Sequence, residues 1–152
     1  MDRGEEFTVG KPGAGRYEAI VSEAVVESVM LVEGDGELRH TLATALRSEA
    51  FYVVEAAGGA TALQLLRDMR GSVEWLITNV DLPTLSGLHV AFEFRFTHPT
   101  RPIIFMTERE VPNGPDLLQG SMTLRPPFSM ADLMPLMDAL RENKHRASTI
   151  GL

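Results

Sequence analysis

The sequence contains no cysteine among its 152 residues, which excludes both disulfide bonds and cysteine-based zinc sites. Basic side chains are also few, because 14 Lys and Arg stand against 21 Asp and Glu and leave a net charge of −7. Nucleic-acid binding draws its affinity from Lys and Arg. The four histidines are scattered without metal-ligand spacing. The composition therefore favours a protein partner over nucleic acid or a metal.

Long apolar runs are missing as well. No segment approaches the roughly 18 uncharged apolar residues of a membrane span. The first six residues carry neither the basic stretch nor the apolar stretch of a secretory signal. We therefore expect a cytoplasmic protein without membrane contact.

Glycine, proline and charged residues dominate residues 1–16, which is typical of a tail. Apolar residues at helical spacing follow it, at Tyr17, Ile20, Val21, Ala24 and Val25. This pattern predicts a short amphipathic helix that caps the domain, or one offered to a partner or to a second copy of the chain. We divide the chain into an N-terminal segment (1–27), one domain (28–144) and a C-terminal tail (145–152).

Within the domain, short apolar runs alternate with segments of helical periodicity. The runs predict five strands, at 29–32, 51–54, 75–78, 103–106 and 122–124. Helical spacing follows the first, second, third and fifth runs, and Asp35 and Ser129 are suited to cap two of these helices. Pro135 should kink the last helix or delay its start. The pattern predicts an α/β fold with a parallel sheet, whose ligands bind beyond the carboxyl ends of the strands.

Two further segments depart from the regular alternation of strands and helices. Residues 108–119 contain Pro112, Asn113, Gly114 and Pro115, which argues against a regular helix there. Phe92, Phe94 and Phe96 alternate within a predicted helix and cannot all face one side. We expect one ring, that of Phe94, to be half-exposed, either as the edge of the core or as an anchor for a partner.

In order and spacing, the segments after the strands resemble the receiver domain of bacterial response regulators, from about Val29 to Arg141. The similar segments are Val32-Glu33-Gly34-Asp35, Glu55-Ala56-Ala57-Gly58-Gly59, Asn79-Val80-Asp81-Leu82-Pro83, Pro102-Ile103-Ile104-Phe105-Met106-Thr107 and Pro127-Phe128. The resemblance implies a doubly wound, three-layer, flavodoxin-like (βα)5 fold with strand order 2-1-3-4-5. It also implies phosphotransfer from a histidine kinase to an aspartate that ends the third strand, with Mg²⁺ bound beside it.

This sequence departs from that scheme at the centre of the site. The phosphoacceptor position is Asn79, and a neutral carboxamide cannot form an acyl phosphate by in-line attack. The acidic pair that would hold Mg²⁺ becomes Glu33 and Gly34, so only Glu33 remains as a weak metal candidate. We therefore expect no cofactor, with weak or absent Mg²⁺ binding, and no catalytic residue. Asp81, two residues beyond Asn79, is the candidate for a substitute acceptor.

The residues that contact and report the phosphoryl group in the family also differ. Thr107 stands where the family has a serine or threonine. The family's lysine position falls on Pro126, or on Arg125 if one residue is inserted, and its aromatic switch position falls on Thr123.

These departures predict a stand-alone receiver-like module of a two-component or phosphorelay system that is not an enzyme and not phosphorylated. We expect it to act by contact with a histidine kinase, a phosphotransfer protein or another response regulator, or as a homodimer. A working phosphoacceptor that uses Asp81 and a pseudo-receiver that senses a small molecule are the alternatives.

Overall fold

The computed structural model describes residues 26–111 and 120–150, with side chains for 26–111 and 120–143. Its elements follow the alternation expected from the apolar runs. In chain order they are β1 (Ser28–Val32), α2 (Gly36–Ser48), β2 (Tyr52–Ala56), α3 (Gly59–Met69), β3 (Trp75–Asn79), α4 (Gly87–Thr97), β4 (Ile103–Met106), β5 (Met122–Leu124) and α5 (Met130–Ile150).

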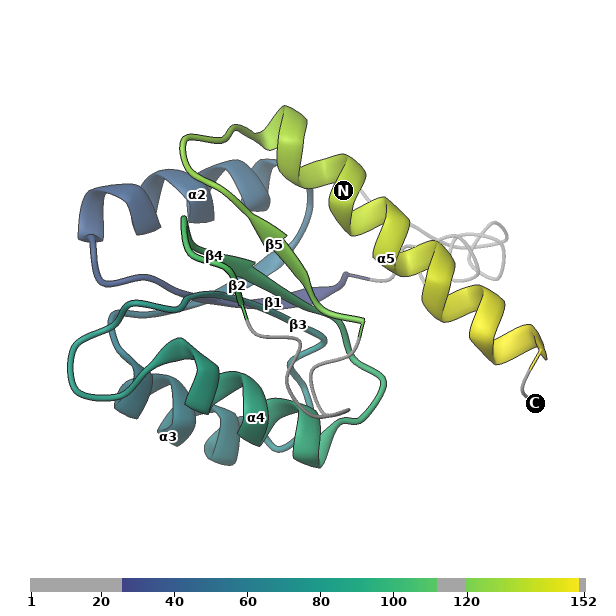
Figure 1. Ribbon diagram of the computed structural model, residues 1–152, viewed down its shortest axis with the longest axis horizontal. Coiled ribbons are helices and arrows are strands. Elements are labelled where there is room, and N and C mark those ends of the chain that lie inside the picture. The colour runs from purple at the N-terminus through teal and green to yellow at the C-terminus, as the bar shows by residue number, and fades with distance from the viewer. Residues whose placement is uncertain (1–25, 112–119, 151–152) are drawn as a thin grey trace, which may run out of the picture.

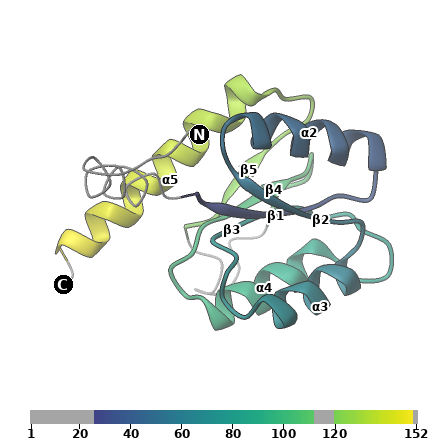
Figure 2. The same ribbon diagram turned by 180° about the vertical axis from the view of Figure 1, so that it is seen from behind.

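The five strands form one parallel sheet in the order β2-β1-β3-β4-β5, which confirms the predicted topology. Helices α2 and α5 cover one face of this sheet, and α3 and α4 cover the other (Figure 1). The view from behind shows the same three layers (Figure 2). Because all strands run the same way, their carboxyl ends meet at one edge, where the loops that carry the candidate site begin.

Alternate side chains of each central strand enter different cores. In β1, Val29 and Leu31 pack beneath α2 and α5, whereas Met30 and Val32 pack beneath α3 and α4. Strands β3 and β4 divide their side chains in the same way between the two cores. Burial on both faces explains why these strands are continuous apolar runs in the sequence instead of alternating ones.

The helix starts follow local sequence signals. The Asp35 carboxylate accepts hydrogen bonds from the backbone N–H groups of Glu37 and Leu38, which confirms Asp35 as the cap of α2. Ser129 Oγ accepts from the N–H of Ala131 at the start of α5. Helix α5 begins at Met130, so Pro135 lies inside it and does not delay its start. The helix continues through Ile150, beyond residue 144, where we placed the end of the domain.

The exposed phenylalanine of α4 differs from the one we expected. Phe94 is 1% exposed and packs with the core on the α3–α4 side, whereas Phe96 is 77% exposed. The sequence prediction for Phe94 is therefore wrong, because alternation shows that the rings diverge but not which way the helix is rotated on the sheet. The predicted helix at 17–25 and residues 112–119 of the proline-rich segment lie outside the described residues.

Candidate functional site

The candidate site lies where β1 and β3 end side by side. These neighbouring strands pair in parallel from Val29 and Trp75 to Val32 and Thr78. Glu33 immediately follows β1, and Asn79 is the last residue of β3. The sheet thus brings together two side chains that are 46 residues apart in the sequence.

The Asn79 carboxamide is hydrogen-bonded at both of its ends. Its Nδ2 donates to Glu33 Oε1 at 3.0 Å, and its Oδ1 accepts from the backbone N–H of Asp81 at 2.9 Å. A carboxylate can only accept and a backbone N–H can only donate, so these partners select one orientation of the amide. Asn79 therefore bridges the end of β1 and the loop that follows β3.

Glu33 is buried, with 4% of its surface exposed, although it carries a carboxylate. Its second oxygen, Oε2, accepts from the backbone N–H of Asp35 at 3.0 Å. Its backbone carbonyl accepts from Arg39 Nη1 at 2.8 Å, and Arg39 Nε reaches Glu55 Oε1 at 3.2 Å. A buried carboxylate needs such partners, because an unpaired charge in a weakly polar surrounding is costly. Here the amide of Asn79 supplies one of them.

Gly34 follows Glu33, at the position where the resemblance implies a second acidic side chain. A Cβ atom built at this position would lie 3.7 Å from the Ala57 carbonyl oxygen and 3.9 Å from Pro83 Cδ, which is ordinary contact. The backbone here would therefore accept a Cβ atom without crowding.

Gly87 fixes the backbone on the other side of Asn79. A Cβ atom at Gly87 would lie 1.9 Å from the Asn79 carbonyl oxygen, a distance that no side chain tolerates. The Gly87 N–H donates to the Val80 carbonyl at 3.0 Å. The start of α4 thus packs directly against the end of β3 and holds Asn79 in place.

Asp81, the candidate substitute acceptor, turns to a different partner. Its exposed carboxylate forms an ion pair with Arg109, and its backbone N–H is what reaches Asn79. The backbone N–H of Arg109 in turn donates to Thr107 Oγ1 at 3.1 Å. Thr107 is 3% exposed, and its own N–H donates to the Leu124 carbonyl of β5. Arg109 therefore links the loops that follow β3 and β4.

The remaining predicted positions lie on and after the edge strand β5. Thr123 is exposed in the middle of this strand and pairs with Phe105. Arg125 is exposed, and its Nη1 donates to the Glu108 carbonyl at 2.8 Å, across to the loop that follows β4. Pro126 is exposed and has no side-chain donor that could replace a lysine.

Two residues of this site were not singled out from the sequence. Arg109 bonds to Asp81 and Thr107, and Arg39 supports Glu33 from α2. The position of Arg109 just after the fourth apolar run was an available signal. No sequence signal indicated the contact of Arg39, which reaches back from the first turn of its helix.

The described part of the chain has neither a cluster of metal-ligating side chains nor a membrane-spanning helix. Among residues 26–111 and 120–143, no group of three or more His, Asp or Glu side chains is placed to hold a metal ion. None of the described helices is long and apolar enough to cross a bilayer.

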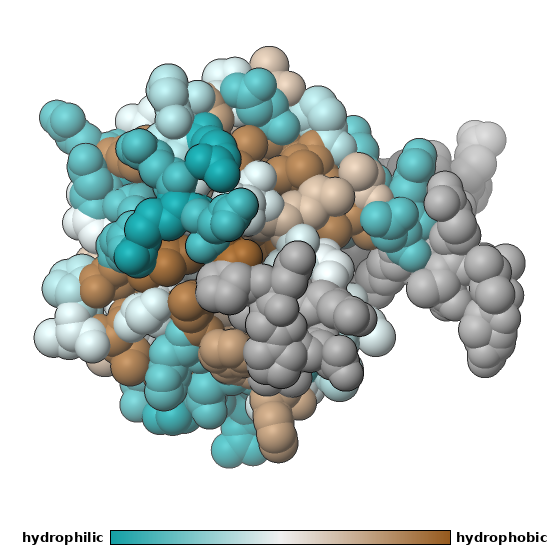
Figure 3. Space-filling view, viewed as in Figure 1, coloured by the Kyte–Doolittle hydropathy of each residue, from teal (hydrophilic) through white to brown (hydrophobic). Residues whose placement is uncertain are grey.

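Hydrophobic side chains gather around the β5 edge and the first turns of α5 (Figure 3). The partly buried residues there are Met122, Leu124, Phe128, Met130, Met134 and Leu136. We call this surface the β5–α5 face.

Comparison with known proteins gives a consistent result. The family model described as the response regulator receiver domain matches residues 29–123. The transcriptional regulatory protein CpxR of Escherichia coli (strain K12) is 32% identical over 123 residues, which cover 79% of this chain and 51% of CpxR. The sensor kinase CckA of Brucella abortus (strain 2308) is 34% identical over 80 residues, which cover 53% of this chain and 8% of the kinase.

Solved structures agree with the sequence matches. The receiver domain of the hybrid histidine kinase CckA superposes with a TM-score of 0.64 at 25% identity, covering 74% of this chain and 97% of that domain. A receiver domain from Clostridium thermocellum superposes with a TM-score of 0.69 at 18% identity, covering 79% and 98% of the two chains. The chain thus spans nearly a whole receiver domain but only about half of CpxR.

Proposed function

The chain belongs to the response regulator receiver domain family, a family of non-catalytic modules in two-component signalling, and from this premise we propose that it is a silent receiver. A silent receiver is here one that takes no phosphoryl group and acts through protein–protein contact. The observation that carries the proposal is the Asn79 carboxamide, bonded to Glu33 through Nδ2 and to Asp81 N–H through Oδ1.

The chemistry of residue 79 supports this proposal directly. An acceptor must offer a nucleophilic carboxylate oxygen to the phosphorus atom. The Asn79 oxygen is neutral and already accepts a hydrogen bond, and its nitrogen is a donor. Neither atom can attack in line.

The surroundings of Asn79 do not fit Mg²⁺ either. This ion demands a near-octahedral set of oxygen ligands at about 2.1 Å. Both oxygens of Glu33 already accept hydrogen bonds, one from the Asp35 N–H and one from the Asn79 amide. Asn79 therefore presents a hydrogen-bond donor to Glu33 where an aspartate would present a second oxygen ligand. Gly34 adds no ligand. We propose that the amide takes over the ion's part in holding the Glu33 carboxylate, by a hydrogen bond in place of a charge.

Contacts between the loops supply a reason why the surface that meets a partner would keep one conformation. Arg109 connects Asp81 to Thr107, and Arg125 connects the end of β5 to Glu108. We propose that these contacts fix the conformation of the loops permanently, whereas in other members of the family a phosphoryl group would set it. The exposed Thr123 replaces the aromatic ring that would report such a change.

The β5–α5 face is the surface that we propose for partner contact. It combines a three-residue edge strand with partly exposed methionine and leucine side chains. Methionine adapts its shape to different apolar partners. Partners of the expected class are a histidine kinase, a phosphotransfer protein or another response regulator.

Incubation with acetyl phosphate and Mg²⁺, read by intact mass, tests the proposal. We expect no gain of a phosphoryl group by the natural chain. The double variant Gly34→Asp/Asn79→Asp serves as the matched positive control, because it supplies carboxylates at both positions and a Cβ atom at position 34 would meet only ordinary contacts. A phosphoryl group on the natural chain that disappears in Asp81→Asn would instead establish the substitute acceptor and end the proposal.

A further inference from the structure

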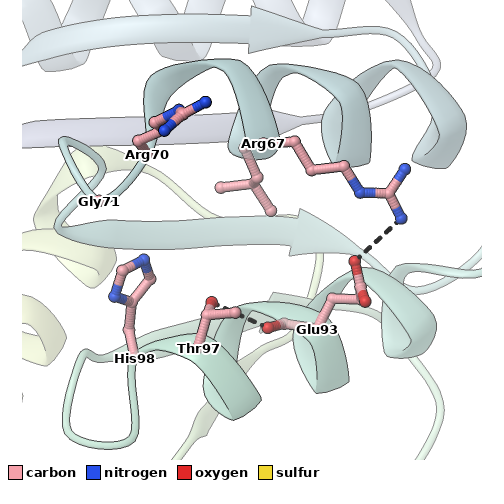
Figure 4. A pocket seen from close by; sticks show the side chains of 7 residues that line it. Arg67, Arg70, Gly71, Glu93, Thr97 and His98 are labelled. Carbon is pink, nitrogen blue, oxygen red and sulfur yellow. Dashed lines mark hydrogen bonds and ion pairs between the residues drawn. The ribbon is translucent and has the colours of Figure 1, made fainter.

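A pocket of about 230 Å³ opens between α3 and α4, away from the Asn79 site. Its lining comes from the last turns of the two helices and the turn that follows α3 (Figure 4). Because these helices run antiparallel to the strands, the pocket lies at the edge of the sheet where the strands begin. The lining residues are Leu66, Arg67, Arg70, Gly71, Glu93, Thr97 and His98.

The charges around this pocket are mainly positive, although the chain as a whole has a net charge of −7. Arg67 pairs with Glu93 at 3.2 Å, the one carboxylate of the lining. No other described residue hydrogen-bonds to or pairs with the Arg70 guanidinium. Arg101 adds a third positive charge, because it lies close enough to lower the pKa of His98, after the larger effect of burial.

The backbone that carries Arg70 is held firmly. Arg70 caps α3 in the left-handed conformation, with φ 45° and ψ 55°, which is unfavourable for a residue other than glycine. Arg101 Nη1 donates to the carbonyls of Gly71 and Val73, at 2.6 Å each, and so clamps the turn. These contacts fix the point at which the Arg70 side chain leaves the chain at the rim of the pocket. The side chain itself is exposed and points away from His98 in Figure 4, so it would have to turn to reach a bound group.

The helix ends here would ordinarily repel an anion through their free carbonyl groups. One of these end carbonyls, that of Met69, accepts from the Ser72 N–H. The carbonyls of Leu66 and Phe94 accept from the N–H groups of Arg70 and His98 as the last helical hydrogen bonds of α3 and α4. An anion bound here must therefore be held by arginine side chains against the field of the two helix ends.

We infer that this pocket binds a small organic anion, a carboxylate or phosphate monoester on an apolar body. Arg70 would hold the anionic group, and Leu66 with the edge of the His98 ring would contact the apolar part. The volume equals that of about eight water molecules at roughly 30 Å³ each, so the ligand has on the order of ten non-hydrogen atoms. This inference goes beyond the proposed function and does not depend on it.

Phenyl phosphate is a suitable probe, and phenol is its neutral counterpart. Titration of the ¹⁵N-labelled full chain should give saturable shifts of the backbone amide signals of Gly71, Ser72 and His98. The dissociation constant should be on the order of millimolar for a ligand of this size. The His98 ring pKa, followed by its own proton signals, should rise with phenyl phosphate and stay constant with phenol.

Variants of Arg70, compared with a variant of an arginine outside the pocket, test whether Arg70 holds the anion. Arg70→Gln should weaken binding about tenfold, because it removes a charge-assisted hydrogen bond. Arg70→Lys should recover part of the affinity. Arg47→Gln, which removes the same charge from α2, should bind as the natural chain does. Equal shifts with phenol, absence of saturation, or equal effects of the Arg47 and Arg70 variants would each overturn the inference.

Discussion

Replacing Asn79 by aspartate tests how the candidate site is held together. In the natural chain, Nδ2 of this residue donates to Glu33 Oε1 at 3.0 Å. In Asn79→Asp a second carboxylate oxygen would face the first at about that distance. Two unit charges 3 Å apart repel by about 5.5 kcal/mol at an effective dielectric constant of 20. The variant cannot keep both charges without a large loss of stability.

Protonation sets the upper limit of this loss. At pH 7 one carboxyl group can take up a proton and donate the missing hydrogen bond. With an unfolded-state pKa of about 3.9, this costs about 1.36 × 3.1, or roughly 4 kcal/mol. We therefore expect Asn79→Asp to lower the free energy of unfolding by about 2–4 kcal/mol at pH 7 without divalent ions. For a domain of this size the melting temperature should fall on the order of 10 °C.

Acidity and magnesium should each reverse this loss. The folded-state pKa of the carboxyl pair is raised above its unfolded value, so the loss grows as pH rises above the unfolded pKa and vanishes below about pH 4. Magnesium at a hundred times its dissociation constant would return about 2.7 kcal/mol to the variant. The natural chain should melt at the same temperature in MgCl₂ and in KCl of equal ionic strength.

The double variant Glu33→Gln/Asn79→Asp is the matched control, because it exchanges donor and acceptor and keeps one carboxylate in the pair. It should recover most of the lost stability without Mg²⁺. Chemical and thermal denaturation followed by circular dichroism measure all of these changes. If Asn79→Asp is as stable as the natural chain at pH 7 without Mg²⁺, the bridge between Asn79 and Glu33 does not exist in solution.

Three further predictions, made with five substitutions in all, test the fold around the site by urea denaturation. Phe94→Ala should lower the free energy of unfolding by about 3–5 kcal/mol, because the ring is buried. Phe96→Ala should change it by less than about 0.5 kcal/mol, because that ring is exposed. If Phe96→Ala is the more destabilising of the two, helix α4 is rotated on the sheet differently from the structure described here. Gly87→Ala should cost at least about 1–3 kcal/mol, since its Cβ would strike the Asn79 carbonyl, while Gly34→Ala should be nearly neutral, and equal effects would contradict the packing of α4 on β3. Asp35→Ala should cost about 1 kcal/mol by removing the cap of α2, and an unchanged midpoint would show that the cap contributes nothing.

Much of this architecture could be predicted from the local sequence. Strands buried on both faces must be continuous apolar runs, and Trp75–Asn79 and Ile103–Met106 were recognisable for that reason. The second strand was displaced by one or two residues, because Phe51 is buried just before β2 begins and Glu55 continues it as a partly exposed edge residue. Side-chain caps at Asp35 and Ser129 depend on neighbours within three residues, so they too could be read from the chain.

The sequence by itself determined that residue 79 carries an amide, that Gly34 has no side chain to offer as a ligand and that Pro126 carries no charge, because these are properties of single residues. Only the tertiary structure decided that the Asn79 amide meets Glu33 and that Arg109 takes the Asp81 carboxylate. It also decided that Phe94 turns inward and that Arg70 lies over a pocket between two helices. Hydrogen-bond partners, helix rotation and cavities depend on distances between segments that are remote in the chain, and those distances exist only after the sheet has formed.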